Sequence, residues 1–302
     1  LDIIIVGKDG STQVATIYEN DVENGNGFTA IGAGLTGVER GAVDWGDYDG
    51  DGDLDLIVTG DDDSSDYFAV IYENDVENGN GFTALGTGLK GVYSSDVDWG
   101  DYDNDGDLDV AVTGIAQDGF GQGPSTTIYE NQGGGSFSVL GSSVPDKQQG
   151  SVVWGDYDGD GDLDLALTGV DASDGFGAIA EIYENDVENG NGFTALGAGL
   201  TPVRFSDVEW GDYDADGDPD LLVAGDEGGS NTAKIYENDV ANSNGFSALN
   251  AGLTGANEGG VDWGDADGDG DLDLVVTGLD NSLDQTATIY ENAVPPSIAV
   301  DQ

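Results

Sequence analysis

The sequence predicts an all-β protein, a β-propeller of four-stranded antiparallel blades, and three observations support this. First, the five tryptophans lie 53 to 56 residues apart, at Trp45, Trp99, Trp154, Trp210 and Trp263. Second, each interval holds four short strand-forming segments separated by Gly, Asn and Asp turns. Third, a nine-residue acidic segment recurs in phase with the tryptophans. This repeat length is typical of a propeller blade, because β-helices use shorter repeats and sandwiches need about 100 residues per unit.

The four expected strands follow one another in each repeat. The first ends at the tryptophan, as in 42–46, and the second follows the acidic segment, as in 54–59. The third ends in Ile-Tyr-Glu-Asn, which occurs at 17–20, 71–74, 128–131, 182–185, 235–238 and 289–292. The fourth is of the Gly-Phe-Thr-Ala-Leu type, at 27–31, 81–85 and 192–196, with variants at 136–140 and 245–249. The Trp and the Ile-Tyr pair recur in equivalent places, so we expect them to pack between blades.

The second and third strands occur six times, but the first and fourth only five. We therefore expect six blades in residues 1–294, with part of a seven-bladed propeller as the alternative. Residues 295–302 are either a closing strand, since Ala299-Val300-Asp301 repeats Ala42-Val43-Asp44, or a linker that starts at Pro295-Pro296. Because Leu1 to Gly7 matches the second half of the motif, Leu54 to Gly60, we expect a processed product or a fragment of a longer chain.

The composition excludes several partners and chemistries. Six basic residues stand against 62 acidic ones, a formal net charge of −56. Such a surface repels nucleic acid and anionic membranes, so neither is an expected partner. The chain has no Cys and no His, which excludes disulfides, thiol chemistry and imidazole as a base or ligand. No apolar run reaches about 18 residues, so membrane insertion is not expected.

The acidic segment has the pattern of a cation-binding loop. In 47–55, carboxylates occupy positions 1, 3, 5, 7 and 9, and glycine occupies position 6. Calcium takes six to eight oxygen ligands, and glycine permits the sharp turn that brings them together. Five carboxylates in nine residues also repel one another strongly without a cation. The sequence thus predicts Ca²⁺, about five ions, in preference to Mg²⁺, which demands tighter octahedral geometry.

Asp-x-Asp-x-Asp-Gly-Asp-Leu-Asp followed by Leu-Ile-Val-Thr-Gly resembles the FG-GAP/VCBS repeats of integrin α-subunit propellers and many bacterial surface proteins. The resemblance covers Leu1 to about Asn292, and five loops in phase make it specific. The Phe-Gly…Gly-Ala-Pro signature is absent, so the bacterial VCBS-like branch is the closer match. The resemblance implies that each loop joins the first two strands of a blade and binds calcium.

By position, the resemblance implies that the first site uses the side chains of Asp47, Asp49, Asp51 and Asp55 and the carbonyl of Asp53. The other four sites correspond to Asp101, Asp103, Asp105, Asp107 and Asp109; Asp156, Asp158, Asp160, Asp162 and Asp164; Asp212, Asp214, Asp216, Asp218 and Asp220; and Asp265, Asp267, Asp269, Asp271 and Asp273.

Three sequence details qualify the metal prediction. Pro219 replaces Leu at position 8 of the fourth loop and removes a backbone donor, which leaves metal binding by that loop open. Asp2 corresponds to the last ligand of a sixth loop. Val58 stands where an EF-hand has its bidentate Glu, so we expect a structural ion and not a sensor switch.

Recognition is expected on the face opposite the metal loops, where the connecting loops vary. Most of the basic residues also fall there. A candidate ligand face consists of Arg40, Tyr93, Lys147, Arg204 and Phe205. The alternative is that these loops vary without a binding role.

The sequence therefore favours a secreted or cell-surface, non-enzymatic calcium-binding propeller for adhesion or assembly. Its partner would be an extracellular protein or glycan, and it would form one module of a larger surface protein or assembly. A lectin is the alternative, because similar propellers bind sugars between blades. A glycan-active enzyme is less favoured. The carboxylates repeat in phase, so no singular catalytic constellation stands out.

Overall fold

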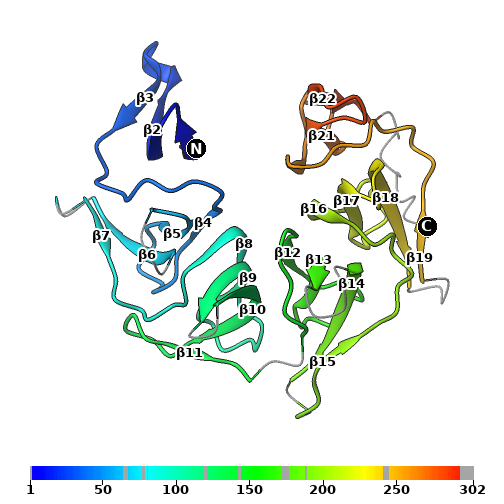
Figure 1. The fold of residues 1–302 in the computed structure, drawn as a ribbon, viewed down its shortest axis with the longest axis horizontal. Coiled ribbons are helices and arrows are strands. Elements are labelled where there is room, and N and C mark those ends of the chain that lie inside the picture. The colour runs from blue at the N-terminus through cyan, green and yellow to red at the C-terminus, as the bar shows by residue number, and fades with distance from the viewer. Residues whose placement is uncertain are drawn as a thin grey trace, which may run out of the picture. The chain divides into compact units, whose positions relative to one another are not determined.

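A computed structural model describes residues 2–63, 67–76, 79, 81–118, 121–141, 144–171, 177–187, 189–240 and 245–292. The chain divides into two compact units, Leu1–Gln148 and Gln149–Gln302. The regular structure of the described residues is β-strand, with one three-residue 3₁₀ helix, η1 (Val22–Asn24) (Figure 1).

Unit 1 contains three blades. Blade 1 consists of β1 (Ile3–Asp9), β2 (Thr12–Asp21) and β3 (Gly27–Ile31). Blade 2 consists of β4 (Val43–Gly46), β5 (Asp55–Gly60), β6 (Phe68–Asp75) and β7 (Gly81–Ala84). Blade 3 consists of β8 (Val92–Gly100), β9 (Asp109–Asp118), β10 (Gly121–Asn131) and β11 (Phe137–Val139). A single pair, Phe68 with Val92, links the last two sheets.

Unit 2 also contains three blades. Blade 4 consists of β12 (Val152–Gly155), β13 (Asp164–Asp171), β14 (Gly177–Asp186) and β15 (Gly192–Ala195). Blade 5 consists of β16 (Arg204–Gly211), β17 (Asp220–Asp226), β18 (Asn231–Asp239) and β19 (Gly245–Ala248). Blade 6 consists of β20 (Val261–Gly264), β21 (Asp273–Leu279) and β22 (Gln285–Tyr290).

In every blade consecutive strands pair antiparallel in chain order, so each blade is a meander. The all-β propeller prediction is confirmed, and the strand boundaries agree with the predicted segments to within a few residues. Among the described residues, blade 1 has no first strand and blade 6 has no fourth strand. Residues 293–302 lie outside the described residues. The domain boundary at 294, the closing strand or linker and the six-bladed ring therefore stay predictions.

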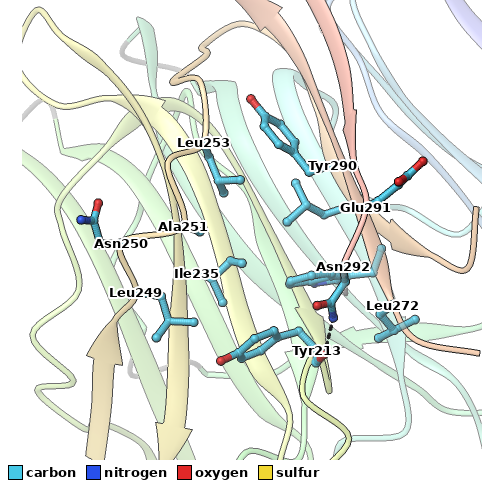
Figure 2. A pocket seen from close by; sticks show the side chains of 12 residues that line it. Tyr213, Ile235, Leu249, Asn250, Ala251, Leu253, Leu272, Tyr290, Glu291 and Asn292 are labelled. Carbon is cyan, nitrogen blue, oxygen red and sulfur yellow. Dashed lines mark hydrogen bonds between the residues drawn. The ribbon is translucent and has the colours of Figure 1, made fainter. Parts of the chain in front are cut away.

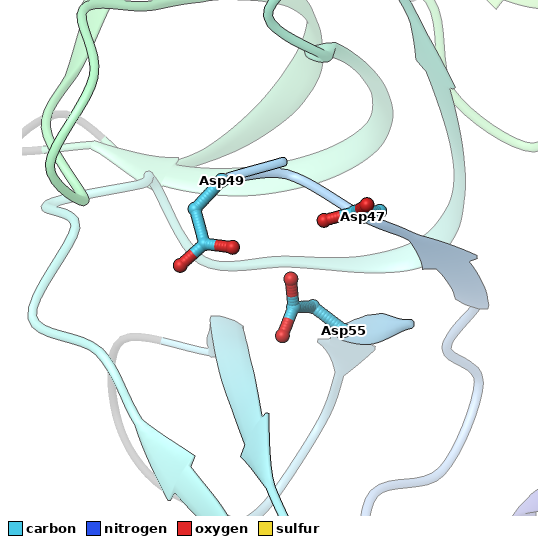
Figure 3. Close-up of side chains that lie close together, drawn as sticks. All are labelled: Asp47, Asp49 and Asp55. Carbon is cyan, nitrogen blue, oxygen red and sulfur yellow. The ribbon is translucent and has the colours of Figure 1, made fainter. Parts of the chain in front are cut away.

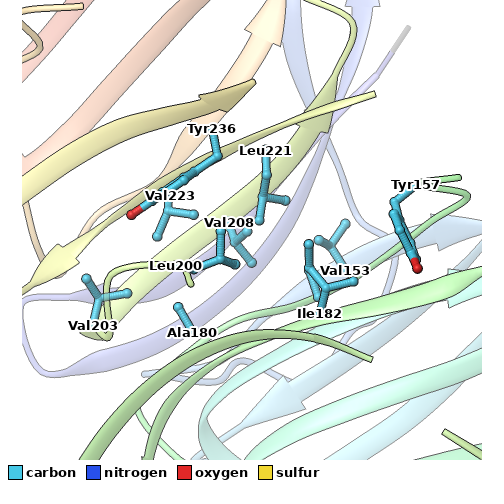
Figure 4. Packing of buried hydrophobic residues seen from close by; sticks show 11 residues of the cluster. Val153, Tyr157, Ala180, Ile182, Leu200, Val203, Val208, Leu221, Val223 and Tyr236 are labelled. Atoms are coloured by element: carbon cyan, nitrogen blue, oxygen red, sulfur yellow. The ribbon is translucent and has the colours of Figure 1, made fainter. Parts of the chain in front are cut away.

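The hydrophobic cores lie between successive blades of a unit. Ile182 of β14 is fully buried against Leu221 and Val223 of β17, and Tyr236 of β18 joins the same cluster (Figure 4). In blades 2, 4 and 5 the second strand is covered on both faces, and all six residues of β5 are buried. Burial of each such aliphatic side chain contributes about 1.5–3 kcal/mol. Blade stacking is therefore a main source of stability within each unit.

The tryptophans and tyrosines fix the spacing between blades, as predicted. Gly155 follows the Trp of blade 4, and a Cβ there would lie 2.6 Å from the Trp210 ring of blade 5. Tyr236 contributes to the same junction between blades 4 and 5, because its hydroxyl oxygen accepts the Thr201 N–H at 2.7 Å. Such a Trp-Gly pair thus forms one side of a tight contact with the next blade.

Candidate metal centres

The five acidic loops connect the first and second strands of blades 2 to 6. We number them loop 1 (47–55), loop 2 (101–109), loop 3 (156–164), loop 4 (212–220) and loop 5 (265–273). In loop 1, carboxylate oxygens of Asp47, Asp49 and Asp55 all lie within 4.8 Å of one another (Figure 3). The same three positions, 1, 3 and 9, converge in loops 2, 3 and 4, namely Asp101, Asp103 and Asp109; Asp156, Asp158 and Asp164; and Asp212, Asp214 and Asp220.

The backbone of the loop holds the position-1 carboxylate in place. Asp47 Oδ1 accepts the N–H of Asp51 at 3.1 Å, and its Oδ2 accepts the N–H of Gly52 at 3.1 Å. Gly52 has a φ of 99°, a left-handed conformation that glycine adopts without steric cost. The glycine at position 6 therefore makes the predicted turn, and the turn aims Asp47 at the centre of the loop.

The position-9 carboxylate is anchored on both oxygens. Asp55 Oδ2 accepts the Tyr48 N–H at 3.2 Å, and Oδ1 accepts the Asn74 N–H at 2.8 Å. Asp55 is only 1% exposed. The equivalent residues of loops 2, 3 and 4 are buried to the same degree and make the same bonds, namely Asp109, Asp164 and Asp220. This position joins the acidic loop to the third strand of its own blade.

The carboxylates at positions 5 and 7 lie outside the converging groups of loops 1 to 4. In loop 1, Asp51 Oδ1 accepts the Asp53 N–H at 2.9 Å and so supports the turn. Their predicted role as ligands, through a side chain or a carbonyl, stays a prediction. The residues concerned are Asp51, Asp53, Asp105, Asp107, Asp160, Asp162, Asp216 and Asp218.

The converging carboxylates are electrostatically strained. Burial and neighbouring carboxylates raise the pKa of Asp49 above its ordinary value. Burial raises the pKa of Asp55 to about 6, and that of Asp109, Asp164 and Asp220 to about 7. A bound cation would relieve this repulsion and favour the ionised form of every member.

Loop 4 has the same arrangement despite Pro219. Asp212 accepts the N–H groups of Asp216 and Gly217 at 3.0 and 3.1 Å, as Asp47 does in loop 1. The unusual residue of this loop is Ala215, whose φ of 58° is left-handed. An alanine is strained there, whereas loops 1, 3 and 5 have glycine at the same position. The proline sits at a position where the lost donor does not disturb the carboxylate group.

Loop 5 differs from the others. Its converging carboxylates are Asp265, Asp267 and Asp269, at positions 1, 3 and 5, and all three are exposed. Asp273, at position 9, lies outside this group, and two backbone N–H groups hold its pKa below its ordinary value. Burial and the neighbouring Asp269 raise the pKa of Asp271 to about 6. One buried oxygen of Asp271, Oδ1, has no hydrogen-bond partner among the described residues.

The sequence pattern missed the asparagine of Ile-Tyr-Glu-Asn as part of the site. Asn131 Nδ2 donates to the Leu108 carbonyl of its own loop at 3.1 Å and to the Tyr48 carbonyl of the preceding blade's loop at 2.8 Å. Asn238 repeats this with Pro219 at 3.0 Å and Tyr157 at 2.6 Å. The constant Asn in all six copies of the motif was the available signal. Within each unit it ties two consecutive acidic loops together.

The glutamate of the same motif also faces the acidic loop. The negative charge of Glu130 contributes to the raised pKa of Asp103, and that of Glu237 contributes to the raised pKa of Asp214. These glutamates come from the third strands, β10 and β18. They add negative charge around a cation in loops 2 and 4, a contribution that the spacing of the aspartates could not reveal.

The donor set fits a hard cation. Each group offers carboxylate oxygens only, as calcium and magnesium prefer, with no nitrogen or sulfur ligand. In loops 1 to 4, the residues at positions 1, 3 and 9 would hold the ion, and the ion would supply a positive charge beside the buried carboxylate at position 9 and its two less buried neighbours. In loop 5, the buried Oδ1 of Asp271, which has no hydrogen-bond partner among the described residues, is also consistent with a bound cation.

The structure brings together some residues of the candidate ligand face within each unit, but not all of them. In unit 1 the Arg40 guanidinium lies 4.6 Å from the centre of the Tyr93 ring and 2.8 Å from an Asp61 oxygen. In unit 2 Arg204 lies 5.5 Å from the centre of the Phe205 ring and pairs with Asp226 at 2.8 Å. Lys147 does not belong to an exposed face. It is only 4% exposed, because its backbone ties it to β9 and β10 through Thr113 and Ser125.

The described residues contain no helix long and apolar enough to cross a membrane.

Comparison with known proteins agrees with the fold. The model of the FG-GAP-like repeat matches residues 47–112 and 212–276, which include loops 1, 2, 4 and 5. A structure of a point mutant of Aleuria aurantia lectin, in complex with alpha-methyl-L-fucoside, is similar with a TM-score of 0.50 and 11% sequence identity. The match covers 97% of this chain and 91% of the lectin chain. No curated protein matches the sequence. The chain is a β-propeller, and two of its segments, 47–112 and 212–276, are similar to the FG-GAP-like repeat.

Proposed function

We propose that this propeller is a calcium-binding module that binds a protein or glycan outside the cell, with calcium as a structural ion and without enzymatic activity. The observation that carries the proposal is the convergence of positions 1, 3 and 9 in four loops of the same geometry. A catalytic site is usually singular, whereas these carboxylates recur in consecutive repeats. Their repetition favours a role in holding the scaffold.

The ion would act on the junctions between blades. It would hold positions 1, 3 and 9 of a loop together. The same loop presents Tyr48 to the next blade, where the ring lies 6.3 Å from the Phe137 ring and the carbonyl accepts from Asn131. A cation that neutralises the carboxylates of the loop would therefore stabilise the contact between Tyr48 and the next blade. This arrangement supports a structural role and not a signalling role.

The type of acidic loop supports a location outside the cell. Extracellular calcium modules work with dissociation constants of about 10⁻⁴–10⁻³ M, because the ion is plentiful there. A loop without the bidentate Glu of an EF-hand is suited to that range. The acidic surface would also be compatible with a partner that carries positive charge.

The direct experiment is a calcium titration of the metal-free protein by calorimetry, with the bound ion counted after equilibrium dialysis. We expect at least four ions per chain and weaker binding of magnesium. Two variants of loop 3 distinguish a residue of the converging group from one outside it. Asp164→Asn changes position 9, which lies in the group, and Asp162→Asn changes position 7, which lies outside it. Stoichiometry unchanged by Asp164→Asn would contradict the assignment of position 9. Absence of any calcium binding would contradict the whole proposal.

Carbohydrate binding is the second candidate, and a cavity in unit 1 favours it. The cavity has a volume of about 720 Å³ and lies between blades 1 and 2. Trp45 and Phe82 line it together with Asp2, Glu19 and Asn74. Aromatic faces beside carboxylate and amide groups can stack on a sugar ring and accept its hydroxyl protons. The similar lectin structure holds a fucoside, which makes that sugar a natural first probe.

This second candidate is tested by titrating the calcium-loaded protein with alpha-methyl-L-fucoside and with a glycan panel. We expect Glu19→Gln to weaken any binding at this cavity, whereas Glu23→Gln, on η1 of the same blade and outside the cavity, should leave it unchanged. If no glycan binds, a protein partner remains. Arg40→Glu and Arg204→Glu would then test the candidate ligand face.

A further inference from the structure

Two aspartates from neighbouring blades meet at the junction between blades 2 and 3. Asp44 lies on β4 and Asp98 lies on β8, each directly before the tryptophan of its blade. The carboxyl groups of Asp44 and Asp98 are hydrogen-bonded to each other. Because carboxylate oxygens only accept hydrogen bonds, this contact requires a proton on one of the two groups. The pair therefore shares one proton between two blades.

The carboxyl group of Asp44 is also fixed by the backbone of both blades. Its Oδ1 accepts the N–H of Trp45 on its own strand at 2.8 Å, and its Oδ2 accepts the N–H of Trp99 on β8 at 3.3 Å. The Trp99 ring packs tightly against blade 2, since a Cβ on Gly46 would lie 2.8 Å from it. Asp44 is thus a direct contact between β4 and β8.

The surroundings of the pair favour its protonated form. Burial raises the pKa of Asp44 to about 6, and the negative charge of Asp96 acts in the same direction. Both Asp96 and Asp98 belong to β8. On β5, the other strand that pairs with β4, the only titratable residue is Asp55, which is anchored at position 9 of loop 1.

The charged residues that precede β4 are paired with other groups. Glu39 forms an ion pair with Lys8, and Arg40 forms one with Asp61 at 2.8 Å. These two basic side chains therefore lie beside other carboxylates. When the shared proton leaves, two negative charges face each other across the junction, with the charge of Asp96 nearby.

Other contacts between blades involve no titratable group. Figure 2 shows one between blades 5 and 6, where Asn292 Nδ2 donates to the Tyr213 carbonyl at 2.6 Å. Blades 4 and 5 have the same asparagine contact and the same tight contact between a glycine and a tryptophan. The residue before the tryptophan of blade 4 is Val153, so a carboxyl pair cannot form at that position. The pair thus adds a proton-sensitive contact to a type of junction that forms without it.

We propose that Asp44 and Asp98 form a proton-dependent contact that holds blades 2 and 3 together and weakens their junction when the shared proton is lost to water. Among the described residues, the groups of three converging carboxylates lie in the acidic loops and do not include this pair, so calcium would find too few ligands here. Because the pKa of Asp44 is raised, the contact contributes stability below about pH 6 and loses it as pH rises through that value.

The direct test follows the two backbone N–H groups that Asp44 accepts. Protein labelled with ¹⁵N on tryptophan alone gives five backbone amide signals. In saturating calcium, which keeps the acidic loops occupied, the Trp45 and Trp99 signals should shift together with a midpoint near pH 6. The Trp154 signal is the control, because Val153 precedes it. Trp45 and Trp99 signals that stay constant from pH 5 to 8 would overturn the proposal.

A variant of the partner carboxyl group distinguishes a shared proton from burial alone. Asp98→Asn keeps a hydrogen-bond donor beside Asp44 at every pH, so the midpoint should move to lower pH. Between pH 5 and 7.5 in calcium, the melting temperature of the wild-type protein should fall by roughly 3–5 °C more than that of Asp98→Asn.

Asp262→Asn is the matched control for this variant. Asp262 also precedes a tryptophan, but it is exposed and accepts the N–H of its own Trp263 at 2.8 Å. Asp262→Asn should keep the decline of the wild-type protein with pH. Melting temperatures that fall in parallel for the wild-type protein and Asp98→Asn would defeat the proposal.

Discussion

Loops 3 and 5 have nearly the same sequence, but the structure gives them different environments. Asp164 of loop 3 is 2% exposed, its pKa is raised to about 7, and Tyr157 of the same loop packs against Phe246 of the next blade. Loop 5 has Ala266 in place of that tyrosine, and its converging carboxylates are exposed. Position 9 is nevertheless 2% exposed and accepts two backbone N–H groups in both loops. The comparison shows that one pattern of aspartates gives two arrangements, in which positions 1, 3 and 9 converge in loop 3 and positions 1, 3 and 5 converge in loop 5.

Calcium removal should have the largest effect and should act mainly through loops 1 to 4. An ion at one hundred times its dissociation constant stabilises the folded state by about 2.7 kcal/mol per site. Chelation should therefore lower the melting temperature by roughly 10 °C or more, since one kilocalorie already shifts a domain of this size by a few degrees. Differential scanning calorimetry with and without chelator measures this. Coincident transitions would refute a structural ion.

The pH dependence of the metal-free protein should follow the same loops. The pKa of Asp109, Asp164 and Asp220 is about 7 in the folded protein, above the ordinary value near 4. The folded state therefore binds more protons between these values, and the free energy of unfolding should fall as pH rises from 4 to 7. Urea midpoints measured in chelator from pH 5 to 8 test this.

A variant isolates that effect from the general repulsion of the acidic surface. Asp220→Asn should make the decline with pH shallower, whereas Asp273→Asn should not, because the pKa of Asp273 is lowered. A wild-type midpoint that rises with pH in chelator would contradict the assignment.

Substitution of position 9 should separate the two kinds of loop directly. Asp164→Asn should remove one bound calcium and lower the melting temperature by several degrees in calcium. The matched change Asp273→Asn should cost less, because positions 1, 3 and 5 converge in loop 5. Calcium stoichiometry and melting temperature of the two variants provide the comparison. Equal losses would mean that loops 3 and 5 hold the ion in the same way.

The glycine that follows a tryptophan gives another comparison, because it makes a tight contact with the next blade in blades 2, 4 and 5 but not in blade 6. A Cβ on Gly155 would lie 2.6 Å from the Trp210 ring, whereas nothing lies within 4 Å of a Cβ on Gly264 in blade 6. Gly155→Ala should destabilise the protein by about 1–3 kcal/mol, the usual cost of overpacking. Gly264→Ala should be nearly neutral. Chemical denaturation of both proteins measures the difference, and a neutral Gly155→Ala would argue against blade packing at this distance.

The last comparison concerns the asparagine that bridges two loops, where we expect an effect no larger than that of Gly155→Ala. Asn238 is 2% exposed and donates to Tyr157 and Pro219, while Asn74 of blade 2 donates only to its own loop, at Leu54. Asn238→Ala should cost about 1–3 kcal/mol, because it leaves buried carbonyls unpaired. Asn74→Ala should cost less than Asn238→Ala. Similar unfolding free energies for the two variants would show that the bridge between loops adds little.

Much of the fold could be read from the chain because the information is local and repeated. The segment 27–31 was predicted as a strand and is β3, and the segment before each Trp-Gly is a strand in blades 2 to 6. The contribution of Asn131 could not be predicted in this way, because its two partners come from different blades. Lys147 was assigned to a surface by its place in a loop, and only the packing around it shows that it is buried.

The sequence by itself determined the repeat, the antiparallel strand order and the glycine turn of each acidic loop, since these depend on residues close together in the chain. Tertiary structure decided which carboxylates meet, which of these groups are buried and which junctions are complete. Those properties depend on a neighbouring blade that excludes water and places an aromatic ring or a carbonyl. Position 9 joins the converging carboxylates in loops 1 to 4 but not in loop 5, although Asp273 is as buried as its equivalents, and the pattern of aspartates does not show this difference.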